Sequence, residues 1–592
     1  MALFHSSASP GIVVNEIDLT GVVPNVQTTT GAYVGNFRWG PAEVVTLVDN
    51  EATLASIFAN PDDNNSIDFH TAAYFLKYSN SLQLVREVTS VAVNSFDSDS
   101  PSMTAGVRTG GFAHTVKNDA DFDFQAAARD SDKHSFIGRY PGALGNSLSI
   151  HTCVADSAGA TQPFAGWTYK SNFESAPTTS AHATSKSATL DEIHVAVIDR
   201  LGEFTGTVGS VLETYPFLSL ALGAKNTDGS SNYIKDVINT KSEYVRLAGF
   251  SAQSQFSANA GTTATSGKSY INAAKTPVVE SFTLVNGVNS AALTPTEIAT
   301  GFDLFEDVDA TTIDFLIAPG MTSNVDQASV VNDLVGIAES TRKDCVVTAS
   351  PSRSAIVDET NTLTATTNAV TSAELFTRSS YLIVDNNYLK VYDKYNDKYI
   401  MIPGSSSTAG LCAATDRAAA PWFSPAGQRR GALLGITSTS YSPTKSNRDT
   451  LYSAGINPVG NVPGQGILLF GDKTFMARPS AFDRINVRRL FLTVERAVSL
   501  AARNVMFEFN DEFTRAEFVN VIEPFLREVK GRRGITDFRV VCDETNNTAA
   551  VIDRNEFIAT LFIKPARSIN YVTLNFVAVR TGVEFEEVVG TV

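Results

Sequence analysis

The sequence predicts a chain of several domains that mixes α+β and α/β regions. Its 592 residues are too many for one hydrophobic core, and about 150 residues per domain gives about four domains. Apolar residues make up 43% and charged residues 18% of the chain, as is typical of folded globular proteins. The residue composition and the predicted secondary-structure pattern change near residues 96, 190 and 455, which divides the chain into four regions.

The overall composition argues against several functional classes. The net charge of −16 disfavours nucleic acid as the main partner, because phosphate binding needs an excess of cations. The four cysteines are scattered without a CxxC pair, which indicates a reducing compartment rather than disulfides or structural zinc. The sequence shows no secretory h-region and no run of about 18 apolar residues, so we expect synthesis in a cytoplasm and no membrane insertion.

The first region predicts strands around one helix. Residues 28–50 (TTTGAYVGNFRWGPAEVVTLVDN) contain two strand-like runs on either side of a Gly-Pro turn. Residues 69–80 (FHTAAYFLKYSN) predict a helix, and residues 82–88 (LQLVREV) predict a strand.

Residues 97–190 have a different composition, because Ser, Thr, Asp, Ala and Gly dominate and apolar runs are short. We expect a surface-exposed, β-rich inserted domain there. Residues 191–455 then follow an α/β pattern, which begins with a buried-type strand at residues 192–199 (EIHVAVID).

The best-defined part of the α/β region is a predicted βαβ unit. Residues 312–320 (TIDFLIAPG) and 345–351 (CVVTASP) read as buried strands. The helical stripe between them consists of Val330, Leu334 and Ile337. Strand, helix and strand at this spacing favour a parallel pair with a crossover helix.

The last region predicts two amphipathic helices. The first spans residues 488–507, and its apolar stripe at helical spacing is Leu490, Phe491, Val494, Val498, Ala501, Ala502 and Val505. The second helix begins at Thr514, where Glu517 completes a capping-box pattern, and it ends at Gly531. Pro524 lies inside this helix and predicts a kink or a break.

Four strands follow the helices, at residues 538–544, 556–566, 570–579 and 583–588. Another strand-like segment, residues 12–18, lies close to the N-terminus, so the chain begins and ends with a strand. Terminal strands carry unpaired backbone N–H and C=O groups. They either pair with each other or are lent to neighbouring subunits by strand addition.

No enzymatic site is recognisable in the sequence. Residues 261–269 (GTTATSGKS) look like a phosphate loop, but five residues rather than four separate Gly261 from Gly267, so we interpret them as a flexible loop. Every histidine lies at or before His194 and no GxSxG motif occurs, which argues against a serine hydrolase. We interpret His151 and His194 as structural residues rather than a metal pair.

One stretch is basic within this acidic chain. Residues 473–533 carry twelve Lys or Arg against eight Asp or Glu, a net charge of +4. The densest part is residues 527–534 (REVKGRRG). This stretch is either a solvated helix end, where cations suit the helix dipole, or a docking surface for an acidic partner.

Several segments resemble the tail sheath proteins of contractile-tailed, myovirus-type bacteriophages. SPGIVVNEID looks like the terminal arm of that family, and the most specific segments are CAATDRAAAPWFSPAGQRRG and RINVRRLFLTVERAVSLAARNVMFEFND. The resemblance covers most of the chain and is thin over residues 97–190.

The resemblance implies a structural, non-enzymatic protein without catalytic, cofactor or metal sites. Members of the family stack as hexameric rings into a six-fold helical sleeve around the tail tube of the virion, after assembly in the host bacterial cytoplasm. Contraction drives the tube through the host envelope for genome ejection. The implied partners are further copies of the chain, the tail tube protein, and the baseplate and tail terminator proteins. Direct contact with nucleic acid and membrane insertion are not expected.

The resemblance also implies a domain order. A core domain combines an N-terminal arm (1–23) with residues 456–592, which include a C-terminal arm, and arms of neighbouring subunits complete its β-sheet. A middle domain of non-catalytic, subtilisin-like α/β fold comprises residues 24–96 and 191–455. Residues 97–190 form the outer, β-rich inserted domain.

The resemblance to tail sheath proteins suggests two sets of site residues. The candidates for strand exchange between subunits are Ile12, Val14, Glu16, Asp18, Val583, Phe585 and Glu587. The tube-facing candidates, on the basic side of the C-terminal helices, are Arg515, Arg527, Lys530, Arg532 and Arg533.

Two alternatives remain open at the level of sequence. The sheath of a phage-derived contractile particle, a tailocin, would need the same kind of subunit, although the large insertion favours a phage. A virion-associated hydrolase would need a nucleophile–base set or a carboxylate pair, and no segment marks one.

Overall fold

The computed structural model describes residues 28–97, 115–125, 136–156, 162–250, 259–271 and 279–569. The chain divides into two compact units. Of the described chain, the larger unit holds residues 28–421 and 425–493, and the smaller one, which we name the C-terminal unit, holds residues 422–424 and 494–569.

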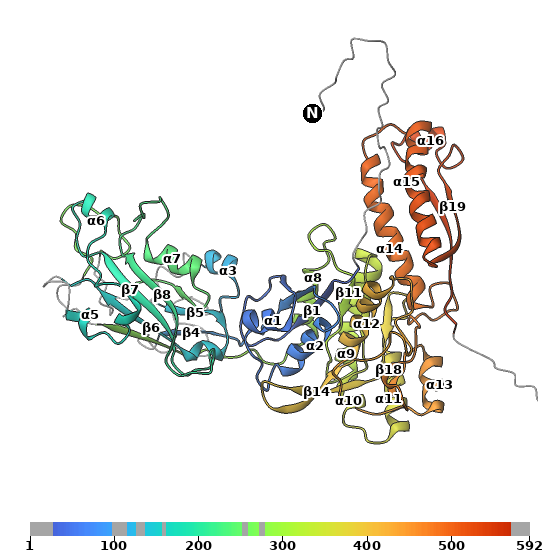
Figure 1. Cartoon of the computed structure of the whole chain (residues 1–592), viewed down its shortest axis with the longest axis horizontal. Coiled ribbons are helices and arrows are strands. Elements are labelled where there is room, and N and C mark those ends of the chain that lie inside the picture. Colours follow the sequence, from blue (N-terminus) through green and yellow to red (C-terminus); the bar gives the residue numbers. More distant parts are fainter. Residues whose placement is uncertain are drawn as a thin grey trace, which may run out of the picture. The chain divides into compact units, whose positions relative to one another are not determined.

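A six-stranded sheet organises the α/β part of the larger unit (Figure 1). From edge to edge its strands are β13 (Leu382–Val384), β12 (Val346–Ala349), β11 (Phe315–Ile317), β1 (Gly31–Gly35), β3 (Leu82–Arg86) and β2 (Thr46–Val48). Neighbouring strands run parallel except β2, which pairs antiparallel with β3. Parallel sheets of this kind are covered on both faces.

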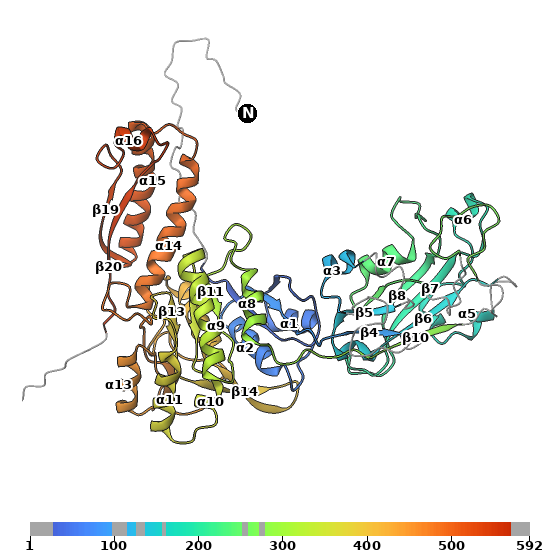
Figure 2. The ribbon, with the colours of Figure 1, turned by 180° about the vertical axis from the view of Figure 1, so that it is seen from behind.

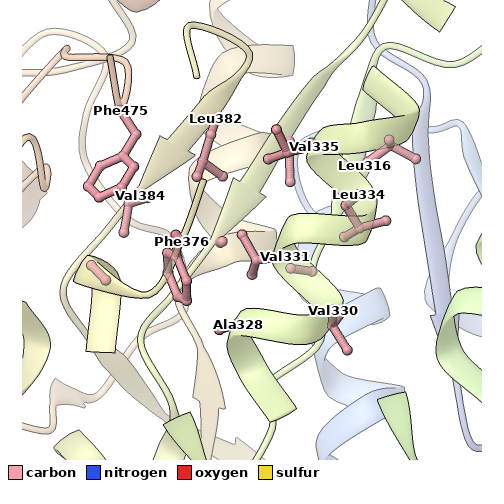
Figure 3. Packing of buried hydrophobic residues seen from close by; sticks show 14 of the residues in the cluster. Leu316, Ala328, Val330, Val331, Leu334, Val335, Phe376, Leu382, Val384 and Phe475 are labelled. Atoms are coloured by element: carbon pink, nitrogen blue, oxygen red, sulfur yellow. The ribbon is translucent and has the colours of Figure 1, made fainter. Parts of the chain in front are cut away.

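Helices cover both faces, so alternate residues of a strand enter different cores. The first face carries α8 (Pro295–Asp303), α9 (Asn324–Gly336), α10 (Arg353–Ile356), α11 (Thr362–Glu374) and α13 (Lys445–Ala454). The second carries α1 (Glu51–Phe58), α2 (Ser66–Leu76), α12 (Ser405–Ala418) and the start of α14 (Ile485–Ala502). Figure 3 shows the first core, where Val331 and Val335 of α9 point toward the side of Leu382 of β13.

The structure confirms the predicted elements of this region. The βαβ unit is β11, α9 and β12, and its strands pair in parallel. Residues 28–50 contain β1 and β2, residues 82–88 contain β3, and the helix expected from residue 69 is α2, which begins at Ser66.

A seven-stranded antiparallel sheet forms the inserted part of the larger unit (Figure 1). In order its strands are β8 (Ser210–Ser219), β7 (Glu192–Asp199), β6 (Leu148–Val154), β10 (Glu280–Val285), β4 (Asn94–Asp97), β5 (Phe136–Pro141) and β9 (Val245–Leu247). Its helices are α3 (Asp119–Phe124), α5 (Gln162–Gly166), α6 (Ala181–Ser185) and α7 (Ile234–Lys241).

This sheet corrects the expected assignment of residues 192–199. That strand, β7, pairs with β6 and β8 in the inserted sheet and not with the parallel strands. The last strand of this sheet along the chain is β10, so the inserted part extends well past the expected boundary at residue 190. The apolar run was recognised as a strand, but its partners are distant in sequence and periodicity does not identify them.

Smaller sheets complete the larger unit. One contains β14 (Tyr388–Asp393), β15 (Lys398–Pro403) and β16 (Ser438–Thr439). The other is the hairpin of β17 (Val459–Val462) and β18 (Gly466–Leu469).

The C-terminal unit contains the end of α14, α15 (Glu512–Gly531), β19 (Ile535–Val541), α16 (Ala549–Ile552) and β20 (Thr560–Pro565). Helix α14 begins at Ile485 and ends at Ala502, five residues short of the expected end. Helix α15 ends at Gly531 as predicted, but it begins earlier, because Asp511 rather than Thr514 caps it and accepts from the Thr514 backbone N–H. It continues through Pro524 without a break.

A buried ion pair fixes α14 to α12 inside the larger unit. The Arg489 guanidinium lies 2.5 Å from both carboxylate oxygens of Asp416 and donates to the Cys412 carbonyl at 3.0 Å. The Thr28 hydroxyl also donates to Asp416. Both charged side chains are almost fully buried, so each is costly without the other.

A buried aspartate lies just after β13, at the carboxyl end of the parallel strands. Asp385 is fully buried, and both of its oxygens accept from the Ser350 hydroxyl, at 2.9 and 3.0 Å. The Asn387 backbone N–H donates to it at 3.0 Å. Burial raises the pKa of this carboxyl to about 7, because these neutral donors offset only part of the cost of removing the charge from water.

We expect Asp416→Ala to destabilise the larger unit by about 3–5 kcal/mol, because it leaves the Arg489 guanidinium buried without its counter-charge. Urea denaturation followed by circular dichroism measures the effect. The matched control is Glu523→Ala, which breaks the pair with the 69% exposed Arg527 and should cost less than about 1 kcal/mol. Equal losses in the two variants would contradict the role of the buried pair.

We also expect the Asp385 carboxyl to make the larger unit less stable as the pH rises from about 4 to about 7. The folded state keeps this proton up to about pH 7, whereas an unfolded aspartate releases it near pH 4. Asp385→Asn removes the titrating group, so its melting temperature should rise relative to that of the native protein between pH 5 and pH 8. If the melting temperatures of the two proteins differed by the same amount at every pH in this range, the prediction would be refuted.

Candidate functional site

The phosphate-loop-like segment is a self-contained loop. Lys268, the lysine of the Gly-Lys-Ser sequence, donates to the Thr262 hydroxyl at 3.1 Å and to the Thr263 carbonyl at 3.0 Å. Its ammonium group is therefore bound by the loop's own oxygens. This geometry agrees with the interpretation of residues 261–269 as a loop.

The two strand histidines have structural surroundings. His194 is buried and stacks on the ring of Phe173, which stacks in turn on Trp167; the ring centroids are 4.5 and 4.9 Å apart. Its Nε2 lies 2.7 Å from the Ser175 carbonyl, and its Nδ1 accepts from the Phe217 backbone N–H at 3.0 Å. Burial lowers the pKa of His194, and it lowers that of His151 as well. Across the described ranges, no group of three His, Cys, Asp or Glu side chains is placed to hold a metal ion.

The C-terminal unit is built around α15 and a hairpin. The apolar stripe of α15 buries Phe518, Ile522, Leu526 and Val529. Strands β19 and β20 pair antiparallel, from Val541 opposite Thr560 to Ile535 opposite Pro565. Figures 1 and 2 show the hairpin lying alongside α15 in both views.

Trp422 joins this unit from a distant part of the chain. Its indole N–H donates to the Arg532 carbonyl at 3.1 Å, and the Arg532 guanidinium lies 5.2 Å from its ring centre. Gly534 packs against the same ring so closely that a Cβ there would lie 3.0 Å from it. The turn between α15 and β19 is therefore fixed in position.

The hairpin sheet is narrow. In the described chain, β19 is hydrogen-bonded to β20 and to no further strand, and the same holds for β20. Isolated two-stranded hairpins are marginally stable in water, and an outer strand edge is a template for pairing with another chain. The outer edges of β19 and β20 are thus candidate sites for strand addition.

The five basic candidates do not lie in one environment. Arg515 is 93% buried, and its guanidinium donates to the Asn510 side chain at 3.0 Å. The other four are exposed. Arg527 pairs with Glu523, Lys530 with Asp537 and Arg532 with Glu528. Arg533 has a left-handed backbone, with φ of 67°.

An exposed aromatic segment was missed by the sequence analysis, which placed Phe507 at the end of a helix. In the structure, residues 503–511 form the turn between α14 and α15. Phe507, Phe509 and Phe513 are 102%, 82% and 75% exposed. The available signal was the alternation of aromatic and acidic residues in the sequence MFEFNDEF, which has no helical stripe.

The proposed arm residues, from Ile12 to Asp18 and from Val583 to Glu587, lie outside the described residues. For the described helices, none has both the length and the apolar character required to cross a membrane.

Comparisons with known proteins identify the family. The phage tail sheath protein central domain matches residues 291–475, and the phage tail sheath C-terminal domain matches residues 477–578. The tail sheath protein of Vibrio phage KVP40 is 32% identical, over 98% of this chain and 99% of that protein. The tail sheath protein of Enterobacteria phage T4 is 30% identical, again over 98% and 99%.

The fold is also that of a solved relative. The crystal structure of a sheath tail protein from Listeria innocua matches with a TM-score of 0.51 at 10% identity, over 91% of this chain and 96% of that chain. Tail sheath proteins are structural and non-enzymatic, in agreement with the loop and histidine geometry. The chain belongs to the phage tail sheath protein family and is a structural subunit of the contractile tail sheath of a virion.

Proposed function

We propose that copies of this chain stack as hexameric rings into a helical sleeve around a tail tube, and that shortening of the sleeve drives the tube through the host cell envelope. The partners are further copies of the chain along the sleeve, the tube inside it, and baseplate and tail terminator proteins at its two ends. The observation that supports this proposal is the two-stranded hairpin of the C-terminal unit, whose outer edges pair with no further strand among the described residues.

The terminal arms are the proposed added strands. Residues 583–586 (VEFE) alternate apolar and acidic side chains, and this period of two suits a strand with one buried face. Residues 12–14 (IVV) are a continuous apolar run, which suits a strand buried on both faces. Backbone hydrogen bonds would supply the affinity of each arm and the alternate side chains its register. In extended strands, Glu16 and Asp18 would share a face with Ile12 and Val14, and Glu587 would share one with Val583 and Phe585.

The basic end of α15 is the proposed tube-facing surface. Arg527, Lys530, Arg532 and Arg533 are exposed there, and an acidic tube surface would complement them. We leave Arg515 out of this surface because its side chain is buried. Neighbouring carboxylates pair with three of the four cations, so contacts to the tube compete with contacts inside the unit.

The α/β part of the larger unit has the role of a rigid body in this proposal. Its parallel sheet with helices on both faces fits the expected subtilisin-like fold. No nucleophile–base pair was found among the residues described above. In this proposal the fold therefore serves packing and not catalysis.

We expect deletion of residues 1–20 to leave folded monomers that cannot form tubes, because the neighbour's sheet then lacks its added strand. Electron microscopy of concentrated protein detects tubes, and thermal unfolding verifies the fold. A second variant, Val14→Pro with Glu16→Pro, keeps the length of the arm but removes two backbone donors from the ladder, and it should fail in the same way. Tubes of normal yield from either variant would rule out the arm assignment.

We expect Arg527→Glu with Lys530→Glu to weaken tube-templated assembly, because the reversed charges would repel an acidic tube. Sheath length and yield on purified tubes, seen by electron microscopy, measure the effect. The control is Arg554→Glu, which reverses another exposed arginine that pairs with a glutamate in the same unit. Unchanged length and yield in the double variant would count against the tube-facing assignment.

A further inference from the structure

The turn between α14 and α15 exposes an unusual amount of aromatic surface. Phe507, Phe509 and Phe513 are all more than 70% exposed, and Met506 beside them is 58% exposed. We name residues 506–513 the aromatic loop. Large apolar side chains that are exposed within eight residues of one another mark a candidate interaction site.

The aromatic loop is held in a defined conformation. The Asn510 side chain donates to the Asn547 side chain at 3.1 Å and to the Glu556 carbonyl at 2.8 Å, which ties the loop to the segment around α16. Asp511 caps α15. Phe507 has a φ of 72°, a backbone region that bulky residues rarely adopt. The rings are thus presented by a fixed backbone, which reduces the entropy lost when they are buried against a partner.

Charge is distributed unevenly along the C-terminal unit. Residues 503–517 and 543–559, around the aromatic loop, contain eight acidic and three basic residues. Residues 527–539 and 560–569, in the last turns of α15 and in the hairpin, contain seven basic and two acidic residues. We name these two groups the acidic half and the basic half; they adjoin where the Val541–Thr560 pair joins the hairpin to residues 543–559. The acidic half of one copy therefore complements the basic half of another.

The basic half also offers an aromatic surface. The hairpin register places Arg539 opposite Phe562 and Asp537 opposite Lys564, so these side chains share one face of the sheet. Arg539 and Lys564 are exposed on that face, and Phe562 is 58% exposed. We name it the outer face of the hairpin. It combines an exposed ring with two cations and with the Asp537 carboxylate, which pairs with Lys530, whereas the aromatic loop combines exposed rings with carboxylates.

We propose that the aromatic loop of one copy docks on the outer face of the hairpin of a second copy. The rings of the loop would pack on Phe562, and Glu508 and Glu512 would lie beside Arg539 and Lys564. We place this contact in a heterologous arrangement, in which each copy uses its loop on one neighbour and its hairpin face on another, so that the contact propagates from copy to copy. It goes beyond the proposed arm exchange, which uses the edges of the hairpin and not its face.

The first test removes the rings. We expect Phe507→Ser with Phe509→Ser to raise the critical concentration for assembly of the full-length chain about tenfold or more, since central aromatic anchors dominate interface energies. Light scattering and electron microscopy measure assembly, and thermal unfolding should be unchanged because both rings are exposed in the monomer. The control is Phe124→Ser, a phenylalanine that is 89% exposed in the inserted part. An unchanged critical concentration in the double variant would overturn the proposal.

The second test exchanges charges. Glu508→Lys and Lys564→Glu should each raise the critical concentration severalfold, and the two together should restore it, because the pair then meets with reversed signs. Asp511 is left intact because it caps α15. Additive losses in the combined variant would overturn the proposed pairing.

The third test is independent of the arms. The described chain has four cysteines, all buried, so a chain with Phe509→Cys and Phe562→Cys can be crosslinked in assembled sheath with a short bismaleimide. The proposal predicts a ladder of covalent multimers, and chains with Phe509→Cys or Phe562→Cys alone should give none. Assembled sheath of the doubly substituted chain without a ladder would contradict the docking contact and leave the arm exchange standing.

Discussion

The central constraint on this molecule is that backbone hydrogen-bonding groups must be paired. Strands β19 and β20 pair with each other, and in the described chain no third strand joins them. The six-stranded sheet of the larger unit is, by contrast, covered by helices on both faces and braced by the buried pair of Arg489 and Asp416. In the C-terminal unit, the outer edges of β19 and β20 are therefore candidate sites for strand addition.

The fold was predictable wherever a local pattern determines the structure. The stripe of Val330 and Leu334 belongs to α9, because a helix buries one face whatever its partners are. Strand β7 was recognised as a strand but placed in the wrong sheet, since an apolar run carries no information about which distant strands it pairs with. The start of α15 was expected at Thr514, but Asp511 caps the helix. Both residue types suit an N-cap, and the local geometry decides between them.

The candidate surfaces were predictable in part. The basic residues at the end of α15 are exposed as charge patterning indicates, but Arg515 is buried, because a long side chain can place its guanidinium against a neighbouring Asn510. The aromatic loop was missed because the predicted helix was extended to Phe507, although the apolar stripe ends at Val505. Only the structure shows that the helix ends at Ala502 and that the rings which follow are exposed.

The two proposed contacts between copies respond differently to movement. A backbone ladder depends little on side-chain identity and tolerates changes in the arm that leads to it, so arm exchange can hold neighbours together while they move. Contacts between side-chain faces are specific and separate as units once their packing is lost. A sleeve that must shorten without dissociating needs both kinds of contact. In these two proposals, the edges of the hairpin β19–β20 serve arm exchange and its outer face serves docking of the aromatic loop. The same thirteen strand residues therefore take part in both contacts.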